Sequence, residues 1–149
     1  MYKSASTRPR SVHAYHLPMK CPSLRGRFQL TRADRIGIER LLSLGLASET
    51  ENPRLMEGFL RHKLRIAGSV LNPVPADLVT AGRYVSYITN NGKTRSGLLT
   101  FVPGKQTLCI PVTSFLGATM LGMQKMQKAP VLRTDGWIDT LVVLNVSGP

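Results

Sequence analysis

Apolar residues spaced three and four positions apart predict a short helix near the start of the chain. Ile38, Leu41 and Leu42 form this stripe, which indicates one buried face. Thr31 precedes the stripe and can accept a hydrogen bond from a free amide of the first turn, while Gly45 follows it as a typical helix end. We therefore expect a helix between Thr31 and Gly45.

A second helix is predicted to begin at Asn52-Pro53, because asparagine caps a helix and a proline at the first position has no N–H to leave unpaired. Its apolar stripe consists of Met56, Phe59, Leu60, Leu64 and Ala67. Glu49 and Glu51 lie in the segment between the two helices. We interpret residues 29–68 as a short antiparallel helical hairpin with an acidic tip.

After residue 69 the pattern changes to the β-branched and aromatic residues that are typical of strands. The strands that this pattern predicts, with the turns between them, are 83–89, a turn at 90–92, 98–102, a turn at 103–105, and 106–112. The Asn-Asn-Gly sequence at 90–92 tolerates positive φ and so favours a tight hairpin turn. We expect the three strands to form an antiparallel meander.

A short helix and a closing hairpin complete the predicted elements. Thr113 or Ser114 can cap a helix that continues to Leu121, and residues 131–132 and 137–146 then flank a turn. The last strand is so apolar that we expect it to lie centrally in the sheet. The predicted fold is α+β: the helical hairpin, then an antiparallel β-sheet domain with one short helix over residues 69–149.

The chain is strongly basic, with 20 Lys and Arg residues against 8 Asp and Glu and a formal net charge of +12 at pH 7. Residues 1–28 contain no acidic residue and no helical or strand periodicity, and their basic residues include Arg8, Arg10, Lys20, Arg25 and Arg27. We interpret this segment as a basic flexible arm. Such an arm either binds phosphate groups without sequence preference or is a solvated tail, and the sequence leaves both open.

Residues suited to catalysis or metal binding are scattered along the chain. Cys21 and Cys109 lie far apart, and His62 is predicted on the surface of the second helix. The sequence contains no nucleophile with a base, no paired carboxylates and no phosphate-binding loop. It therefore predicts no catalytic residue, no metal site and no cofactor. Because the sequence has no run of roughly 18 apolar residues that could span a bilayer, we expect a cytoplasmic protein with no membrane contact.

Residues 74–85 and 110–122 contain two motifs that resemble the regulator of nucleoside diphosphate kinase (Rnk) family and the C-terminal domain of Gre-type transcript cleavage factors. The first is Val74-Pro75-Ala76-Asp77-Leu78-Val79-Thr80 with Arg83-Tyr84-Val85, which is similar to the Pro-x-Asp-Val-Val-Thr segment and the strand after it. The second is Ile110-Pro111-Val112 with Leu116-Gly117-Ala118-Thr119-Met120-Leu121-Gly122, which is similar to the Pro-x-Gly-x-Ala-Leu-Leu-Gly helix. The turn at 135–137 and the strand at 141–144 fall where these proteins have a final hairpin.

The resemblance implies an FKBP-like domain over residues 69–149 that holds RNA polymerase. In Gre factors a long hairpin also carries acidic residues down the secondary channel of the polymerase. The first helix predicted here spans only about 20 Å, at roughly 1.5 Å per residue. The resemblance therefore implies a non-enzymatic bacterial transcription regulator that binds RNA polymerase near the secondary channel without cleaving transcripts.

The candidate contacts with the polymerase are Glu49, Glu51, Met123, Lys125, Met126 and Lys128. Glu49 and Glu51 lie at the tip, where a Gre factor presents its metal-assisting carboxylates, although polar loop tips also carry glutamate for solubility alone. Met123 and Met126 are apolar residues among lysines, at a place where the family pattern has Gly-Asp. This arrangement favours an interface, and for Met123 core packing is an equal alternative.

Two other functions remain open on the sequence. The basic arm, with Tyr84 or Tyr87 stacking on bases, would make a nucleic-acid-binding module for RNA or DNA, although tyrosines on a strand also serve cross-strand packing. The other is a divergent peptidyl-prolyl isomerase. It is disfavoured because aromatic residues make up only 6% of the chain, which indicates no aromatic-lined pocket.

Overall fold

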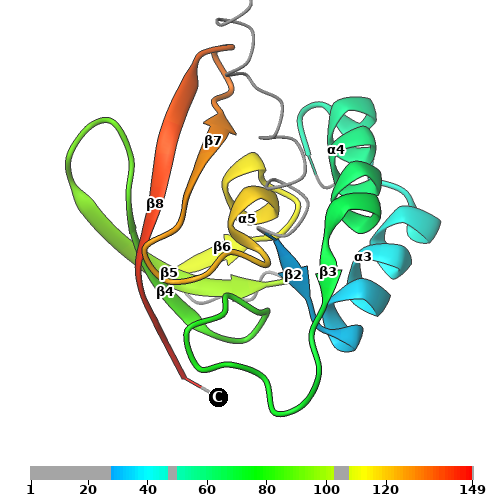
Figure 1. Ribbon diagram of the computed structural model, residues 1–149. Coiled ribbons are helices and arrows are strands. Elements are labelled where there is room, and N and C mark those ends of the chain that lie inside the picture. The colour runs from blue at the N-terminus through cyan, green and yellow to red at the C-terminus, as the bar shows by residue number, and fades with distance from the viewer. Residues whose placement is uncertain (1–27, 47–49, 103–107, 149) are drawn as a thin grey trace, which may run out of the picture.

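The computed structural model describes residues 28–46, 50–102 and 108–148, and Figure 1 shows a pair of helices beside a curled sheet that encloses a third, short helix. The helices are α3 (Arg32–Leu44), α4 (Pro53–Ile66) and α5 (Phe115–Met120). The strands are β2 (Gln29–Leu30), β3 (Gly68–Ser69), β4 (Tyr84–Ile88), β5 (Thr94–Thr100), β6 (Cys109–Pro111), β7 (Lys128–Leu132) and β8 (Ile138–Ser147). The predicted α+β class is confirmed. The predicted arm lies outside the described residues except for Phe28.

All three helices begin at the predicted caps. Thr31 Oγ1 accepts a hydrogen bond from the Asp34 N–H at 3.1 Å, and Asn52 Oδ1 accepts one from the Leu55 N–H at 3.3 Å. In the same way Ser114 Oγ caps α5. The hairpin helices are short, with 13 residues in α3 and 14 in α4. Among the described residues, no helix is long and apolar enough to cross a membrane.

The main sheet has five strands in the order β6-β5-β4-β8-β7. The β4–β5 hairpin and the β7–β8 hairpin are antiparallel, as predicted, and β4 pairs with β8 between them. Gly92, in the first of these turns, has φ 78°, the conformation for which glycine is suited. The apolar strand β8 lies inside the sheet with a neighbour on each side, whereas β4 is the central strand.

The third predicted strand pairs in the opposite sense to the prediction. β6 runs parallel to β5, with Leu98 opposite Cys109 and Thr100 opposite Pro111, so the three strands are not an antiparallel meander. A tight turn can join two antiparallel strands, whereas two parallel strands need a longer crossover connection. The turn residues at 103–105 therefore suggested the wrong direction for β6. β6 is also an edge strand, which tolerates the proline at its end.

The helical hairpin and the sheet domain share one hydrophobic core. Leu30, Ile38 and Leu60 are at most 1% exposed and pack in the same cluster as the buried residues of the sheet and α5. The short parallel pair β2–β3 joins the two regions, and the Gln29 N–H donates to the Gly122 carbonyl at 3.0 Å. The helices therefore lie against the sheet domain, as Figure 1 shows.

A buried lysine connects α4 to α5. Lys63 is 1% exposed, and its Nζ donates to the carbonyl oxygens of Ala118, Thr119 and Leu121 at 2.5, 2.7 and 2.6 Å. These carbonyls lie at the C-terminal end of α5, where a helix leaves its acceptors unpaired and attracts a cation. The Phe28 ring also lies 4.4 Å from Nζ. Lys63 therefore caps α5 from a neighbouring helix.

Two arginines hold further elements in the same way. Arg35 of α3 donates to the Leu64 carbonyl at 3.1 Å and to the Ala67 carbonyl at 2.8 Å, at the end of α4. Arg83, just before β4, donates to the Pro75 carbonyl at 2.7 Å. Part of the positive charge of the chain is thus used inside the fold, so the net charge overstates what the surface offers to a polyanion.

Candidate functional site

An apolar cleft opens where α4, α5 and the β7–β8 hairpin meet. Its volume is about 280 Å³. The residues that line this apolar cleft are Leu55, Phe59, Phe115, Thr119, Pro130, Leu132 and Ile138. Apart from the threonine, every lining residue is apolar. A surface depression of this composition is typical of a site that receives an apolar side chain of a protein partner.

The rim of the apolar cleft leaves large apolar side chains in water. Leu55 on α4 is 45% exposed, Ile138 at the start of β8 is 63% exposed, and the adjacent Trp137 is 71% exposed. Apolar side chains that are exposed singly are normal on protein surfaces, but Leu55 and Ile138 both line this one cleft. The free energy gained by covering such surface is about 25 cal/mol per Å². This cleft is therefore the strongest candidate for a protein interface in the described part of the chain.

The tip of the helical hairpin lies close to this cleft. Glu49 is outside the described residues, whereas Glu51 is exposed and borders a second cavity, of about 190 Å³, with Thr113, Ser114 and Phe115. The part of the tip that the structure describes, Thr50 and Glu51, therefore lies beside the start of α5 and does not project from the domain. Within residues 28–46, 50–102 and 108–148, no group of three or more His, Cys, Asp or Glu side chains is placed to hold a metal ion.

The predicted contacts near β7 divide into one buried and three exposed residues. Met123 is 0% exposed and packs in the core, so its side chain is not accessible to a partner. Met126 is 62% exposed and has φ 69°, and Lys125 and Lys128 on either side of it are also exposed. The Met126 N–H donates to the Val143 carbonyl at 2.6 Å, which attaches the turn to β8. Met126 is thus the methionine that this surface presents.

The two tyrosines of β4 do not form a stacking platform. Tyr87 is 8% exposed and belongs to the core, whereas Tyr84 is 49% exposed. Because the two residues are three positions apart on one strand, their side chains leave opposite faces of the sheet. His62 on α4 is exposed, as predicted, and its Nδ1 lies 3.3 Å from the Arg65 guanidinium. The predicted nucleic-acid residues, Arg8, Arg10, Lys20, Arg25 and Arg27, lie outside the described residues.

A comparison with solved structures finds a similar fold in a transcription elongation factor. The chain is similar to a structure described as "Prokaryotic transcription elongation factor GreA/GreB from Nitrosomonas europaea", with a TM-score of 0.59, 16% sequence identity, and coverage of 81% of this chain and 99% of that chain. At this identity the likeness shows the fold alone. The predicted Gre-type fold is thereby supported.

Two further solved structures are similar at lower scores. GreA factor homolog 1 (Gfh1) of Thermus thermophilus gives a TM-score of 0.40 at 13% identity, over 82% of this chain and 99% of that chain. Gfh1 of Thermus aquaticus gives a TM-score of 0.42 at 12% identity over the same shares. No protein-family model matches the sequence. No curated protein matches it either.

Proposed function

We propose that this chain is a non-enzymatic transcription regulator that binds RNA polymerase near its secondary channel, as a Gre-type factor does, without stimulating transcript cleavage. The observation that carries the proposal is the shared fold with the Nitrosomonas europaea elongation factor, which extends over 99% of that chain. The two sequence motifs that resemble Gre and Rnk proteins lie in the sheet domain, at the segment that leads into β4 and at β6 and α5. A role in transcription is the simplest function that accounts for both.

The apolar cleft is the surface through which we propose that the polymerase is bound. It combines exposed apolar side chains with a depression deep enough for one anchoring side chain. The partner surface would present an apolar residue from a helix or loop. The hairpin of α3 and α4 is short and lies against the sheet domain, which supports binding at the entrance of the channel over deep insertion.

Ile138→Glu is expected to weaken retention of RNA polymerase about tenfold, because a charge would enter the apolar cleft on binding. Ile138 is 63% exposed, so the folded domain should tolerate the change. The measurement is capture of polymerase from lysate by the tagged full-length chain after nuclease treatment and at raised salt. Leu71→Glu is the matched control, since Leu71 is 84% exposed and does not line the cleft. Equal retention by Ile138→Glu and the unsubstituted chain would contradict the proposed surface.

The turn at Met126 is a second surface proposed for the same partner. Met126→Glu should then weaken polymerase retention, while leaving the unfolding midpoint close to that of the unsubstituted chain, because the side chain is 62% exposed. Charge reversal at Lys125 or Lys128 would show whether the flanking lysines contribute to docking. If Met126→Glu binds normally and Ile138→Glu does not, the apolar cleft alone carries the interaction.

The chain is expected not to accelerate cleavage of the transcript in a stalled elongation complex. The reason is geometric, because the described side of the hairpin tip lies beside α5 and the helices are too short to reach a distant catalytic metal. The measurement is the rate at which shortened RNA appears with and without the chain, with a Gre factor as the positive control. Faster cleavage that is lost in Glu51→Ala would overturn this part of the proposal and assign Glu51 a metal-assisting role.

A further inference from the structure

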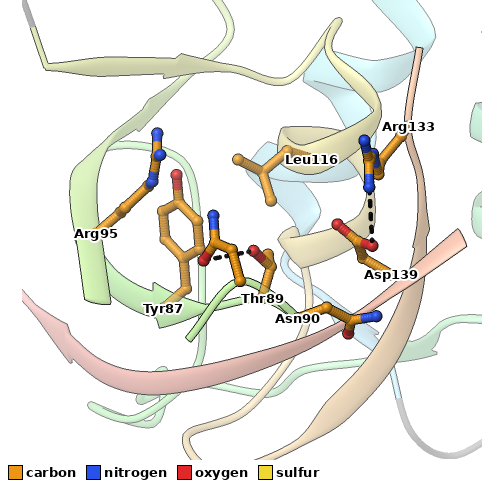
Figure 2. A pocket seen from close by; sticks show the side chains of 8 residues that line it. Tyr87, Thr89, Asn90, Arg95, Leu116, Arg133 and Asp139 are labelled. Carbon is orange, nitrogen blue, oxygen red and sulfur yellow. Dashed lines mark hydrogen bonds and ion pairs between the residues drawn. The ribbon is translucent and has the colours of Figure 1, made fainter. Parts of the chain in front are cut away.

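A third cavity, distinct from the apolar cleft and from the cavity beside Glu51, lies on the inner face of the sheet, between the β4–β5 hairpin and the start of α5. It has a volume of about 540 Å³, within the range of roughly 300–1,000 Å³ that is typical of small-molecule sites. The residues that line this donor cavity are Tyr87, Thr89, Asn90, Asn91, Arg95, Leu116, Arg133 and Asp139. Figure 2 shows the Tyr87 hydroxyl, the Arg95 guanidinium and the Leu116 side chain turned toward the same space.

The asparagine amides at the turn are held so that their donors remain free. Asn90 Oδ1 accepts from the Thr140 N–H at 2.8 Å, and Asn91 Oδ1 accepts from the Lys93 N–H at 3.0 Å. Since both amide oxygens are engaged by the backbone, the NH₂ group of each asparagine is left to bind a ligand. Within the described residues, neither amide nitrogen has a hydrogen-bond partner. The turn therefore contributes donors to the cavity.

The charges of the donor cavity do not cancel. Asp139, the one carboxylate among the lining residues, pairs with Arg133 at 3.6 Å, and Arg133 also binds Asp135 at 2.5 Å. In the described part of the chain, Arg95 has no carboxylate partner. Arg95 lies opposite Tyr87 across the β4–β5 pair, which holds its guanidinium beside the phenol. One arginine therefore faces the cavity without a counter-charge.

The Tyr87 hydroxyl is a donor under ordinary conditions. Burial raises the pKa of Tyr87 above its usual value, and the positive charge of Arg95 offsets only part of that rise. The phenol therefore stays protonated, and the described residues provide no acceptor for its proton. The cavity combines this hydroxyl with a guanidinium fork and two amide groups, all of which need acceptors.

We propose that the donor cavity binds a small organic phosphate, with the phosphate on Arg95, the Tyr87 hydroxyl and the amide groups of Asn90 and Asn91. A phosphate group presents more acceptor oxygens than a carboxylate, and it matches the arginine fork in a bidentate contact. The cavity is larger than a bare phosphate needs, and Leu116 supplies an apolar wall for the organic part of the ligand. This site is separate from the apolar cleft and does not depend on the proposed role in transcription.

The test is titration of the full-length chain with adenosine monophosphate, inorganic phosphate and succinate, followed by calorimetry and by shifts of the asparagine and arginine side-chain resonances. We expect saturable binding of the nucleotide, weaker binding of phosphate and the weakest binding of succinate. Arg95→Ala should lower nucleotide affinity about tenfold, and Tyr87→Phe should lower it several-fold, because each removes a donor to the anion.

Two control variants separate this site from unspecific attraction by positive charge. Lys93→Ala removes a charge from the same hairpin without touching the cavity, and Arg40→Ala removes an exposed charge from α3, away from the cavity. Both should bind the nucleotide as the unsubstituted chain does. The proposal is overturned if binding is not saturable, if these controls lose as much affinity as Arg95→Ala, or if succinate binds as tightly as the nucleotide.

Discussion

Lys63→Ala is expected to lower the free energy of unfolding by about 4 kcal/mol. The substitution removes the group that pairs three buried carbonyls at the end of α5, and it leaves a cavity where the aliphatic stem packed. An unpaired buried acceptor costs about 1–3 kcal/mol, although removal of a buried cation offsets part of that cost. Burial lowers the pKa of Lys63 well below its usual value, because desolvation disfavours the charged ammonium group. The hydrogen bonds to the three carbonyls offset part of this desolvation cost.

Lys63→Met separates the hydrogen bonds from the packing. Methionine fills most of the space of lysine but donates nothing, so this variant should lose about 2 kcal/mol, roughly half of the loss in Lys63→Ala. Urea unfolding followed by circular dichroism gives both values. Arg65→Met on the same helix is the control, because Arg65 is exposed and should change stability by less than about 0.5 kcal/mol. A Lys63→Met variant as stable as the unsubstituted chain would show that the carbonyls find other donors.

The elements that the sequence predicts well are those that local chemistry determines. Thr31, Asn52 and Ser114 each cap the helix that follows them, because a capping side chain binds an amide only three residues further on. Gly92 and Gly136 have φ 78° and 92° in the two hairpin turns. The turn itself requires this positive φ, so no contact with a distant residue is needed to explain it. Such signals are complete within a few residues of sequence.

The pairing of β6 shows where local signals end. The turn residues at 103–105 favour a hairpin, but the strand that follows pairs with β5 in parallel. Gly97 provides a reason in the packing, because a Cβ on this residue would lie 2.8 Å from Ile110 Cγ1 and 3.0 Å from the Leu108 carbonyl oxygen. The missing side chain permits β6 to approach, and sequence periodicity gives no information on which strand fills that space.

Lys63 was detectable in part. It lies at the spacing of Met56 and Leu60, on the apolar face of α4, so the helical period itself placed a charged residue toward the core. What the sequence does not contain is the identity of the acceptors, because Ala118 and Leu121 are more than fifty residues away along the chain. The apolar cleft was not predicted for the same reason, since its walls come from α4, α5 and the last hairpin.

Asp34 is the second buried charged residue of the fold. It lies in the first turn of α3, where the helix dipole favours a carboxylate. It is 3% exposed, its Oδ1 accepts from the Ala81 N–H at 3.4 Å, and its Oδ2 has no partner among the described residues. Burial raises the pKa of Asp34 to about 6, against the lowering effects of the Ala81 amide, Thr31 and the positive charge of Arg83.

This raised pKa predicts that Asp34 destabilises the fold as the pH increases. Between the ordinary value of 3.8 and about 6 the folded chain binds a proton at Asp34 that the unfolded chain has released, so the free energy of unfolding falls with pH across that window. The expected loss is about 3 kcal/mol, complete above the folded pKa. In Asp34→Asn this contribution should be absent.

The measurement is the difference in unfolding free energy between the unsubstituted chain and Asp34→Asn, taken from urea titrations at intervals from about pH 3.5 to about pH 7. The difference removes the contributions of the other carboxylates. Glu39→Gln, an exposed acid on the same helix, should run parallel to the unsubstituted chain. If Asp34→Asn also runs parallel, Asp34 is ionised in the fold at low pH and the Ala81 amide with Arg83 outweighs its burial. If the curves diverge as expected, the contact between α3 and the loop before β4 is strongest in acid, and Asp34 couples the position of the helical hairpin on the sheet to protonation.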